Sequence, residues 1–469
     1  MPAAIDLARL DAKLDQLTGA PATAKLRALI READDRELFR INPYSFAERE
    51  GVSPGQAVEL FLRAAALGLV RAEWSMFCRG CGEYALSRPG LSELDGSFHC
   101  GACSRDRATN LDEQVEVGFT IDPEIRPLRY AHPEILELED YFFTYKFSPN
   151  ILVRGEGSRL VDYLRARVQL MTRLAPGERA VVDVELEEGW VVGSPRAMIT
   201  VEGPHAEGVR DVELTFDGAA FLPRPTIAPG RARIAVHNAS AATTPVLLYF
   251  TPIVTYFEYA PMLTGQRLLN TDDFRRYLRT EVVRPGTGIP VRDNTLLFSD
   301  LSGSTALYDR IGDPAAFELV SSHFEVLARI VTRRAGVVVK TIGDALMASF
   351  SRPADAVHAA LEMRDAVTKL AEPLRLKIGI HRGPALVVNV RDSVDYFGQT
   401  VNIAARVQAV AAAGEVCLTA AVYEDPEVRA ELATFGDLPF EERTLRGVGD
   451  RHRVYRLAAR PVTDTRPAT

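Results

Sequence analysis

Three segments decide the fold of the C-terminal part of this chain: TLLFSDLSGST (295–305), VVVKTIGDALM (337–347) and DYFGQTVNIAAR (395–406). In the first, a short apolar run predicts a strand, and Asp300 falls at its end. A predicted helix then opens with small residues: Ser302, Gly303, Ser304 and Thr305. Because a helix N-terminus presents free amides and a positive dipole end, this segment is typical of a phosphate site beside a carboxylate.

The second segment predicts a β-hairpin with a carboxylate at its turn. Residues 337–341 form a β-like run, Asp344 closes a tight turn, and residues 345–350 return as a third strand. Such a turn can approach the end of a neighbouring strand. Two aspartates with open positions suit Mg²⁺, which binds one or two carboxylates together with substrate phosphates. Taken singly, each aspartate has a simpler interpretation as a helix cap or a turn residue.

The third segment predicts a buried helix of small apolar residues after the turn at Gly398. Asn402 and Arg406 are four residues apart and therefore share one helical face. Such a pair is either part of a satisfied salt bridge or functional. Arginine suits a phosphoryl transition state because it is always charged and its donors form a fork. The three segments together favour a functional site.

Residues 291–458 resemble the catalytic domain of class III adenylyl and guanylyl cyclases, which implies an α+β, ferredoxin-like fold. The resemblance assigns six positions, filled by the residues that adenylyl cyclases use: Asp300 and Asp344 for two Mg²⁺ or Mn²⁺ ions, Lys340 and Asp395 for the purine, and Asn402 and Arg406 for the transition state. It also implies the backbone of Leu301 as a metal ligand. Arg446 is favoured as a contact for the terminal phosphates, whereas Arg451 and Arg453 are predicted to lie on a solvated strand face.

The resemblance implies an adenylate cyclase that converts ATP to 3′,5′-cyclic AMP and pyrophosphate. In the family each chain of a dimer supplies half of a site, so a chain with both halves implies a head-to-tail homodimer. Lys340 could donate to an adenine ring nitrogen while Asp395 accepts from the exocyclic amine, and guanine mismatches both groups. The alternatives are a guanylate cyclase and, from another class, a regulatory protein that binds nucleotide with little turnover.

Four of the five cysteines form two CxxC motifs that are 18 residues apart: Cys78, Cys81, Cys100 and Cys103. This spacing predicts a zinc ribbon over residues 76–108 with one structural Zn²⁺. Two disulfides are the alternative, which a reducing compartment disfavours. Cys417, in the apolar run GEVCLTA, is predicted to be a small buried hydrophobe.

Residues 1–75 are helical in pattern and resemble a winged-helix segment. Ser53 and Pro54 are typical of a helix start, and the segment before them suggests a helix-turn-helix followed by a strand at 69–74. The second helix, PGQAVELFLRAAALGL, contains one arginine and no lysine or asparagine. DNA readers need basic and amide side chains, so packing or dimerisation is the favoured role.

Residues 109–254 are rich in short strand-like runs and predict a β-sandwich with a regulatory role. The runs lie at residues 114–120, 180–187, 197–201, 212–216, 232–237 and 245–250. Residues 255–290 are predicted to be a helical linker, with a helix at 255–283, before the cyclase domain at 291–460. Residues 461–469 are predicted to be a disordered tail.

Composition bounds the remaining possibilities. The chain has 469 residues, of which 47% are hydrophobic and 25% charged, so several globular domains are expected. A net charge of −8 gives no electrostatic case for nucleic acid as a main partner. The N-terminus does not resemble a signal peptide, and we find no apolar run long enough to span a membrane. We therefore expect a cytoplasmic protein.

Overall fold

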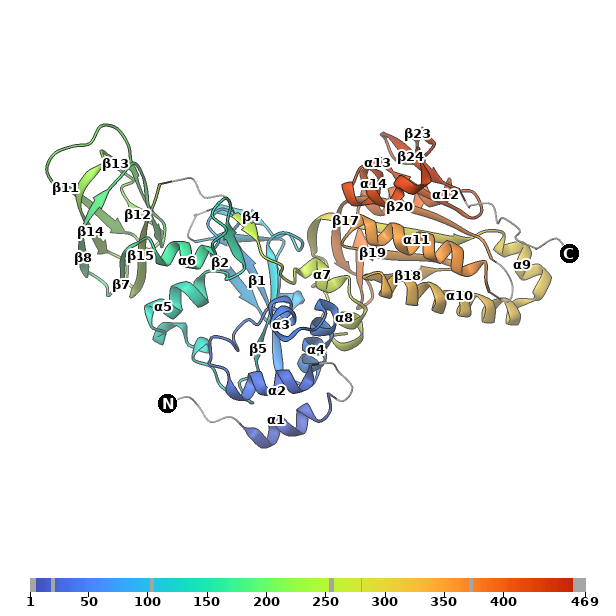
Figure 1. The fold of residues 1–469 in the computed structure, drawn as a ribbon, viewed down its shortest axis with the longest axis horizontal. Coiled ribbons are helices and arrows are strands. Elements are labelled where there is room, and N and C mark those ends of the chain that lie inside the picture. Colours follow the sequence, from blue (N-terminus) through green and yellow to red (C-terminus); the bar gives the residue numbers. More distant parts are fainter. Residues whose placement is uncertain are drawn as a thin grey trace. The chain divides into compact units, whose positions relative to one another are not determined.

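The computed structural model of the protein describes residues 6–17, 22–101, 105–252, 257–279, 281–370 and 374–458. The chain divides into two compact units (Figure 1). The first comprises residues 1–109 and 114–264, and the second comprises residues 110–113 and 265–469. The predicted tail at 461–469 lies outside the described residues. None of the described helices is both long and apolar enough to cross a membrane.

The first unit begins with four helices: α1 (Leu7–Leu14), α2 (Thr23–Glu32), α3 (Pro43–Glu50) and α4 (Pro54–Ala66). The predicted start of α4 is confirmed. The Ser53 side chain accepts a hydrogen bond from the backbone amide of Gln56, and the Gln56 side-chain oxygen accepts one from the Ser53 amide. The two bonds together form a capping box. Phe46 and Phe61 pack edge to face between α3 and α4. The winged-helix interpretation stays a prediction.

A three-stranded antiparallel sheet follows, in the order β2 (Tyr84–Arg88), β1 (Val70–Phe77) and β5 (Val115–Ile121). The prediction that the strand at 114–120 belongs to the sandwich is wrong, because β5 pairs with β1 along its whole length. The hairpin of β3 (Ser97–Cys100) and β4 (Arg105–Ala108) lies between β2 and β5 in the sequence.

Short elements connect this sheet to the sandwich. They are the 3₁₀ turns at Arg129–Ala131 (η2) and Pro133–Ile135 (η3), α5 (Leu138–Asp140), the π-helical turn η4 (Tyr141–Lys146), β6 (Ile151–Val153) and α6 (Leu160–Arg165). A further 3₁₀ turn, η1 (Leu91–Glu93), lies between β2 and β3 in the sequence. The strand β6 pairs with β16 (Phe257–Tyr259), which comes after the sandwich in the sequence. The predicted sandwich therefore does not begin at residue 109.

The sandwich itself spans Val168–Thr251 and has two sheets. One has the order β13 (Thr226–Ile227), β10 (Ala197–Val201), β9 (Gly189–Ser194), β15 (Thr244–Thr251) and β7 (Val168–Leu174). The other has the order β12 (Phe221–Leu222), β11 (Arg210–Phe216), β14 (Gly230–Asn238) and β8 (Arg179–Leu186). Alternate residues of both sheets form a shared core that includes Val191, Leu214 and Ile234.

The prediction of a single helix over residues 255–283 is wrong. The described part of this segment contains β16 and two short helices, α7 (Gly265–Leu269) and α8 (Asp272–Tyr277). The second helix starts anew because the Thr271 side chain accepts from the Phe274 amide.

The second unit is built on one mixed sheet with the order β18 (Gly336–Ile342), β19 (Ala345–Phe350), β17 (Gly288–Leu301), β20 (Leu376–Asn389), β22 (Glu415–Thr419), β24 (Arg451–Leu457) and β23 (Phe440–Thr444). The strand β21 (Val394–Phe397) pairs with β20. The helices are α9 (Ser304–Ile311), α10 (Asp313–Arg333), α11 (Pro353–Val367), α12 (Gln399–Ala409), α13 (Ala420–Tyr423) and α14 (Pro426–Leu432), with a 3₁₀ turn, η5, at Ala433–Phe435.

Helices cover both faces of this sheet. Val416 and Leu418 of β22 belong to the core with α10 and α11, whereas Cys417 between them packs with α12. Cys417 is fully buried, as predicted, and burial raises its pKa to about 12. The helix α12 lies so close to β20 that a Cβ on Gly379 would come 2.0 Å from the Gln408 nitrogen. Only glycine fits at this position.

Candidate active site

Asp300, near the end of β17, lies beside Asp344, which is in the turn between β18 and β19. Ser299 of β17 pairs with Leu346 of β19, which brings Asp300 next to the turn that carries Asp344. Burial raises the pKa of Asp300, and the nearby Asp344 carboxylate raises it further. The Oδ2 atom of Asp344 is buried and has no hydrogen-bond partner within the described ranges. Two carboxylates that repel each other, one with an open oxygen, fit a divalent cation.

The predicted phosphate segment follows Asp300 directly. The chain turns at Gly303, whose φ of 76° is left-handed, and α9 begins at Ser304. The Ser302 amide donates to the Arg375 carbonyl at 2.9 Å, so this amide is already engaged. The backbone amide of Leu301 donates to Asp300, and the side chain of Thr305 lies outside the described part of the structure.

Sequence reasoning missed two residues near the aspartates. The Gln408 side chain of α12 donates to Asp300. Tyr308 of α9 bonds with Ser304, and burial together with the charges of Asp344 and Asp300 raises its pKa. Neither residue belongs to a recognisable pattern, because both act through the packing of a helix rather than through a motif.

Lys340 and Asp395 form an ion pair, although they are 55 residues apart. The distance from Lys340 Nζ to Asp395 Oδ2 is 2.6 Å. The Asp395 side chain is nearly buried and accepts from the Tyr396 amide at 2.8 Å, while the Lys340 side chain is 39% exposed. The strands β18 and β21 thus bring together a donor and an acceptor at one accessible position.

Asn402 and Arg406 lie on the outer face of α12. Both side chains are exposed, while Ile403 and Val407 on the opposite face are buried. Among the described residues Arg406 makes no ion pair, so the salt-bridge interpretation of this pair has no support. The exposed face of α12 therefore carries a side-chain amide and a guanidinium.

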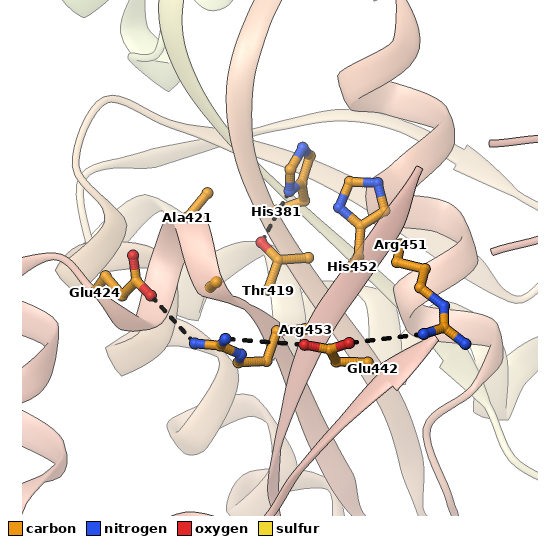
Figure 2. Close-up of a pocket in the computed structure, with 9 residues that line it drawn as sticks. His381, Thr419, Ala421, Glu424, Glu442, Arg451, His452 and Arg453 are labelled. Atoms are coloured by element: carbon orange, nitrogen blue, oxygen red, sulfur yellow. Dashed lines mark hydrogen bonds and ion pairs between the residues drawn. The ribbon is translucent and has the colours of Figure 1, made fainter. Parts of the chain in front are cut away.

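Arg446 lies in the exposed turn between β23 and β24. Arg451 and Arg453 are exposed on β24, as expected. Arg451 Nη1 and Arg453 Nη2 each lie 3.9 Å from a carboxylate oxygen of Glu442. These two arginines line a cavity of about 330 Å³ together with His381, Thr419, Glu424 and His452. Figure 2 shows these lining side chains. Burial lowers the pKa of His381 to about 4, and its Nδ1 bonds with Thr419 at 2.8 Å. None of the six motif residues lines this cavity.

Three cysteines of the predicted ribbon converge. The Sγ atoms of Cys78, Cys81 and Cys100 all lie within 4.8 Å of one another, and Cys103 lies outside the described residues. Cys81 Sγ and Cys100 Sγ are 3.7 Å apart, which is too long for a disulfide. Tetrahedral Zn²⁺ with bonds of about 2.3 Å requires an S–S separation of about 3.8 Å, so this thiol group fits zinc.

We expect reduced, chelator-washed protein to contain one Zn²⁺ per chain, and Cys81→Ser to lower that content sharply. Thiolates in a tetrahedral set hold zinc tightly, and a small ribbon has little core of its own. Elemental analysis measures the content, and Cys417→Ser is the matched control because Cys417 lies in the other unit. A zinc content near zero in folded wild-type protein contradicts the ribbon.

The chain matches two families. Residues 5–276 match a family described as "Family of unknown function (DUF5939)", and residues 290–444 match the "Adenylate and Guanylate cyclase catalytic domain". The receptor-type adenylate cyclase GRESAG 4.1 of Trypanosoma brucei brucei is 26% identical over 219 residues, which cover 37% of this chain and 17% of that protein. An uncharacterized protein of Mycobacterium tuberculosis is 36% identical over 123 residues, covering 26% of this chain and 32% of that protein.

Among solved structures, that of the adenylate cyclases from Trypanosoma brucei in their monomeric state is 28% identical and has a TM-score of 0.32, covering 35% of this chain and 88% of that chain. The chain spans less than half the length of both curated relatives. The first family covers more than half of the chain. The chain therefore belongs to the DUF5939 family of unknown function, and its C-terminal part is a class III nucleotide cyclase catalytic domain.

Proposed function

We propose that the protein is an adenylate cyclase, which converts ATP to 3′,5′-cyclic AMP and pyrophosphate at a homodimer interface, with the N-terminal family region as its regulatory part. The observation that carries this proposal is the Lys340–Asp395 ion pair of 2.6 Å. Lys340 donates to the adenine ring nitrogen N1, and Asp395 accepts from the exocyclic amine. Guanine offers a protonated N1 and a carbonyl oxygen instead, which leaves both side chains mismatched.

In the proposed reaction the ribose 3′-oxygen bonds to the α-phosphorus, and the bond from this phosphorus to the leaving pyrophosphate breaks. The 3′-hydroxyl proton is released. Asp300 and Asp344, with the backbone of Leu301, would hold Mg²⁺ or Mn²⁺, which lowers the pKa of the hydroxyl and neutralises the phosphates when bound. Asn402 orients the ribose, and Arg406 stabilises the charge that develops at the α-phosphate.

The phosphates have further candidate partners. The hydroxyl of Ser302 and the residues Gly303, Ser304 and Thr305 lie next to Asp300 in the sequence, and Arg446 is exposed in its turn. Two observations support a shared site: Asn402 and Arg406 face outward from α12, and Arg406 has no ion pair among the described residues. An exposed pair of this kind is suited to complete the site of a second copy of the chain.

The proposed activity is tested by incubating the purified chain with ATP or GTP and either Mg²⁺ or Mn²⁺. We expect cyclic AMP and pyrophosphate in equal amounts from ATP, and much less cyclic GMP from GTP, because the purine pair matches adenine alone. Mass spectrometry of the products measures both. A preference for GTP would indicate a guanylate cyclase. Nucleotide binding without cyclic product would indicate the regulatory binding protein.

A further inference from the structure

The segment that enters the cyclase domain is hydrogen-bonded to both strands of the purine pair. Arg275 of α8 donates from Nη1 to the Val339 carbonyl at 3.3 Å and from Nη2 to the Val394 carbonyl at 3.1 Å. Val339 immediately precedes Lys340, and Val394 immediately precedes Asp395. One guanidinium thus holds the backbone on both sides of the ion pair.

The sheet itself does not join these two strands. The strand β18 pairs with β19, and β21 pairs with β20, which lies on the other side of β17. The register of β18 also shifts between Val338 and Lys340, so Val339 is the extra residue of a bulge. A bulge leaves its extra residue outside the ladder. Arg275 therefore supplies a hydrogen-bond donor for the carbonyl of a residue that the β18–β19 register skips.

The guanidinium of Arg275 has few competing interactions. It makes no ion pair in the part of the chain that the structure describes, and its Nε is buried there without a hydrogen-bond partner. Burial lowers its pKa, an effect that the nearby Tyr396 and Asp395 oppose. A charged group that is partly withdrawn from water depends strongly on the bonds that it keeps, which are the two carbonyls.

Asn270 forms a second anchor at the end of α7. Its Oδ1 accepts from the Tyr396 hydroxyl at 2.9 Å and from Ser349 Oγ at 2.8 Å. Its Nδ2 donates to Ser351 Oγ at 3.0 Å. Tyr396 is buried and directly follows Asp395. Arg275 and Asn270 therefore connect the α7–α8 segment to β18, β19 and β21, and neither residue belongs to a catalytic motif.

We propose that Arg275, supported by Asn270, is a positioning residue for base selection, because it fixes the separation of Lys340 and Asp395. The inference rests on the proposed function of that pair. Arg275 is also among the last residues of the region that matches the N-terminal family, which ends at residue 276. The final element of that family thus holds the strands that discriminate between purines, and a displacement of α8 would alter nucleotide preference.

Arg275→Ala is expected to lower the ratio of ATP to GTP turnover, expressed as kcat/KM, on the order of 10-fold, mainly through the KM for ATP. Arg275→Lys restores part of the ratio because an ammonium reaches one carbonyl. The matched control is Arg276→Ala, since Arg276 is exposed on the same helix and its guanidinium lies over the Tyr277 ring. This control should leave the ratio unchanged.

An unchanged ratio in folded Arg275→Ala, or an equal loss for both nucleotides, overturns the inference. If Arg275→Ala does not fold, Tyr396→Phe tests the second anchor by removal of one hydroxyl, and the same fall in the ratio is expected. If the wild type forms no cyclic product, the proposed function fails. The inference is then decided by the preference for ATP over GTP in displacing a fluorescent ATP analogue, which Arg275→Ala should reduce.

Discussion

Asp344→Ala and Arg406→Ala are each expected to be nearly inactive alone and to regain activity when they are mixed. Loss of a single preorganised group of this kind typically costs ~10²–10³ in rate. In a heterodimer, the Arg406→Ala chain supplies intact aspartates and the Asp344→Ala chain supplies an intact arginine. One of the two sites is then wild type, and the other carries both changes.

Random exchange of subunits makes half of the dimers mixed, so about one quarter of all sites should be intact. The measurement is cyclic nucleotide formation per chain after exchange. A mixture of Asp300→Ala with Asp344→Ala is the matched control, because both changes lie in the same half of the site and no intact site can form. Absence of recovery, with heterodimers demonstrated through two affinity tags, contradicts the shared site.

Lys340→Glu combined with Asp395→Cys is expected to weaken ATP cyclisation and shift the relative preference toward GTP. The carboxylate then accepts from the protonated guanine N1, and the acceptor for the adenine amine is lost. A site that leaves buried polar groups unpaired can discriminate by up to ~10⁴–10⁵-fold, so a change of at least ~10²-fold in the ATP/GTP ratio is expected. Competition between the two nucleotides in one reaction measures it directly.

The control for this double change is Arg453→Glu combined with Glu442→Cys. That pair is also basic and acidic and belongs to the same domain, but it lines the cavity of Figure 2 rather than the purine position. It should leave the ratio unaltered. An equal loss for ATP and GTP in the Lys340/Asp395 variant, with fold and dimer intact, would mean that this ion pair only stabilises structure.

Local patterns predicted the elements that carry the site. The predicted bounds of three strands and one helix lie within a few residues of β17, β18, β19 and α12. These elements could be predicted because each has its own apolar period and turn. The adjacency of Lys340 and Asp395 came from the family resemblance, since no pattern in one segment reports a partner 55 residues away.

Other features depend on distant parts of the chain. The run at 114–120 is a strand, but nothing within it indicates that its partner is β1. Within the described residues, the hydrogen-bond partners of Arg275 are backbone carbonyls, which every residue has, so its role leaves no signature in the sequence. The expected helix at 255–283 failed because Thr271 begins a new helix within it.

Under the proposed function, the closed Lys340–Asp395 ion pair has a consequence for binding, because each side chain is already engaged with a competitor for the purine. Any base must first separate two charges that lie 2.6 Å apart. Adenine offers each side chain a new hydrogen-bond partner, so the free energy of replacing the ion pair is nearly balanced. Guanine leaves both charged side chains without a partner. Rejection of the wrong nucleotide would then be fixed by the stability of the closed ion pair, and would strengthen as the strands that carry the pair become more rigid.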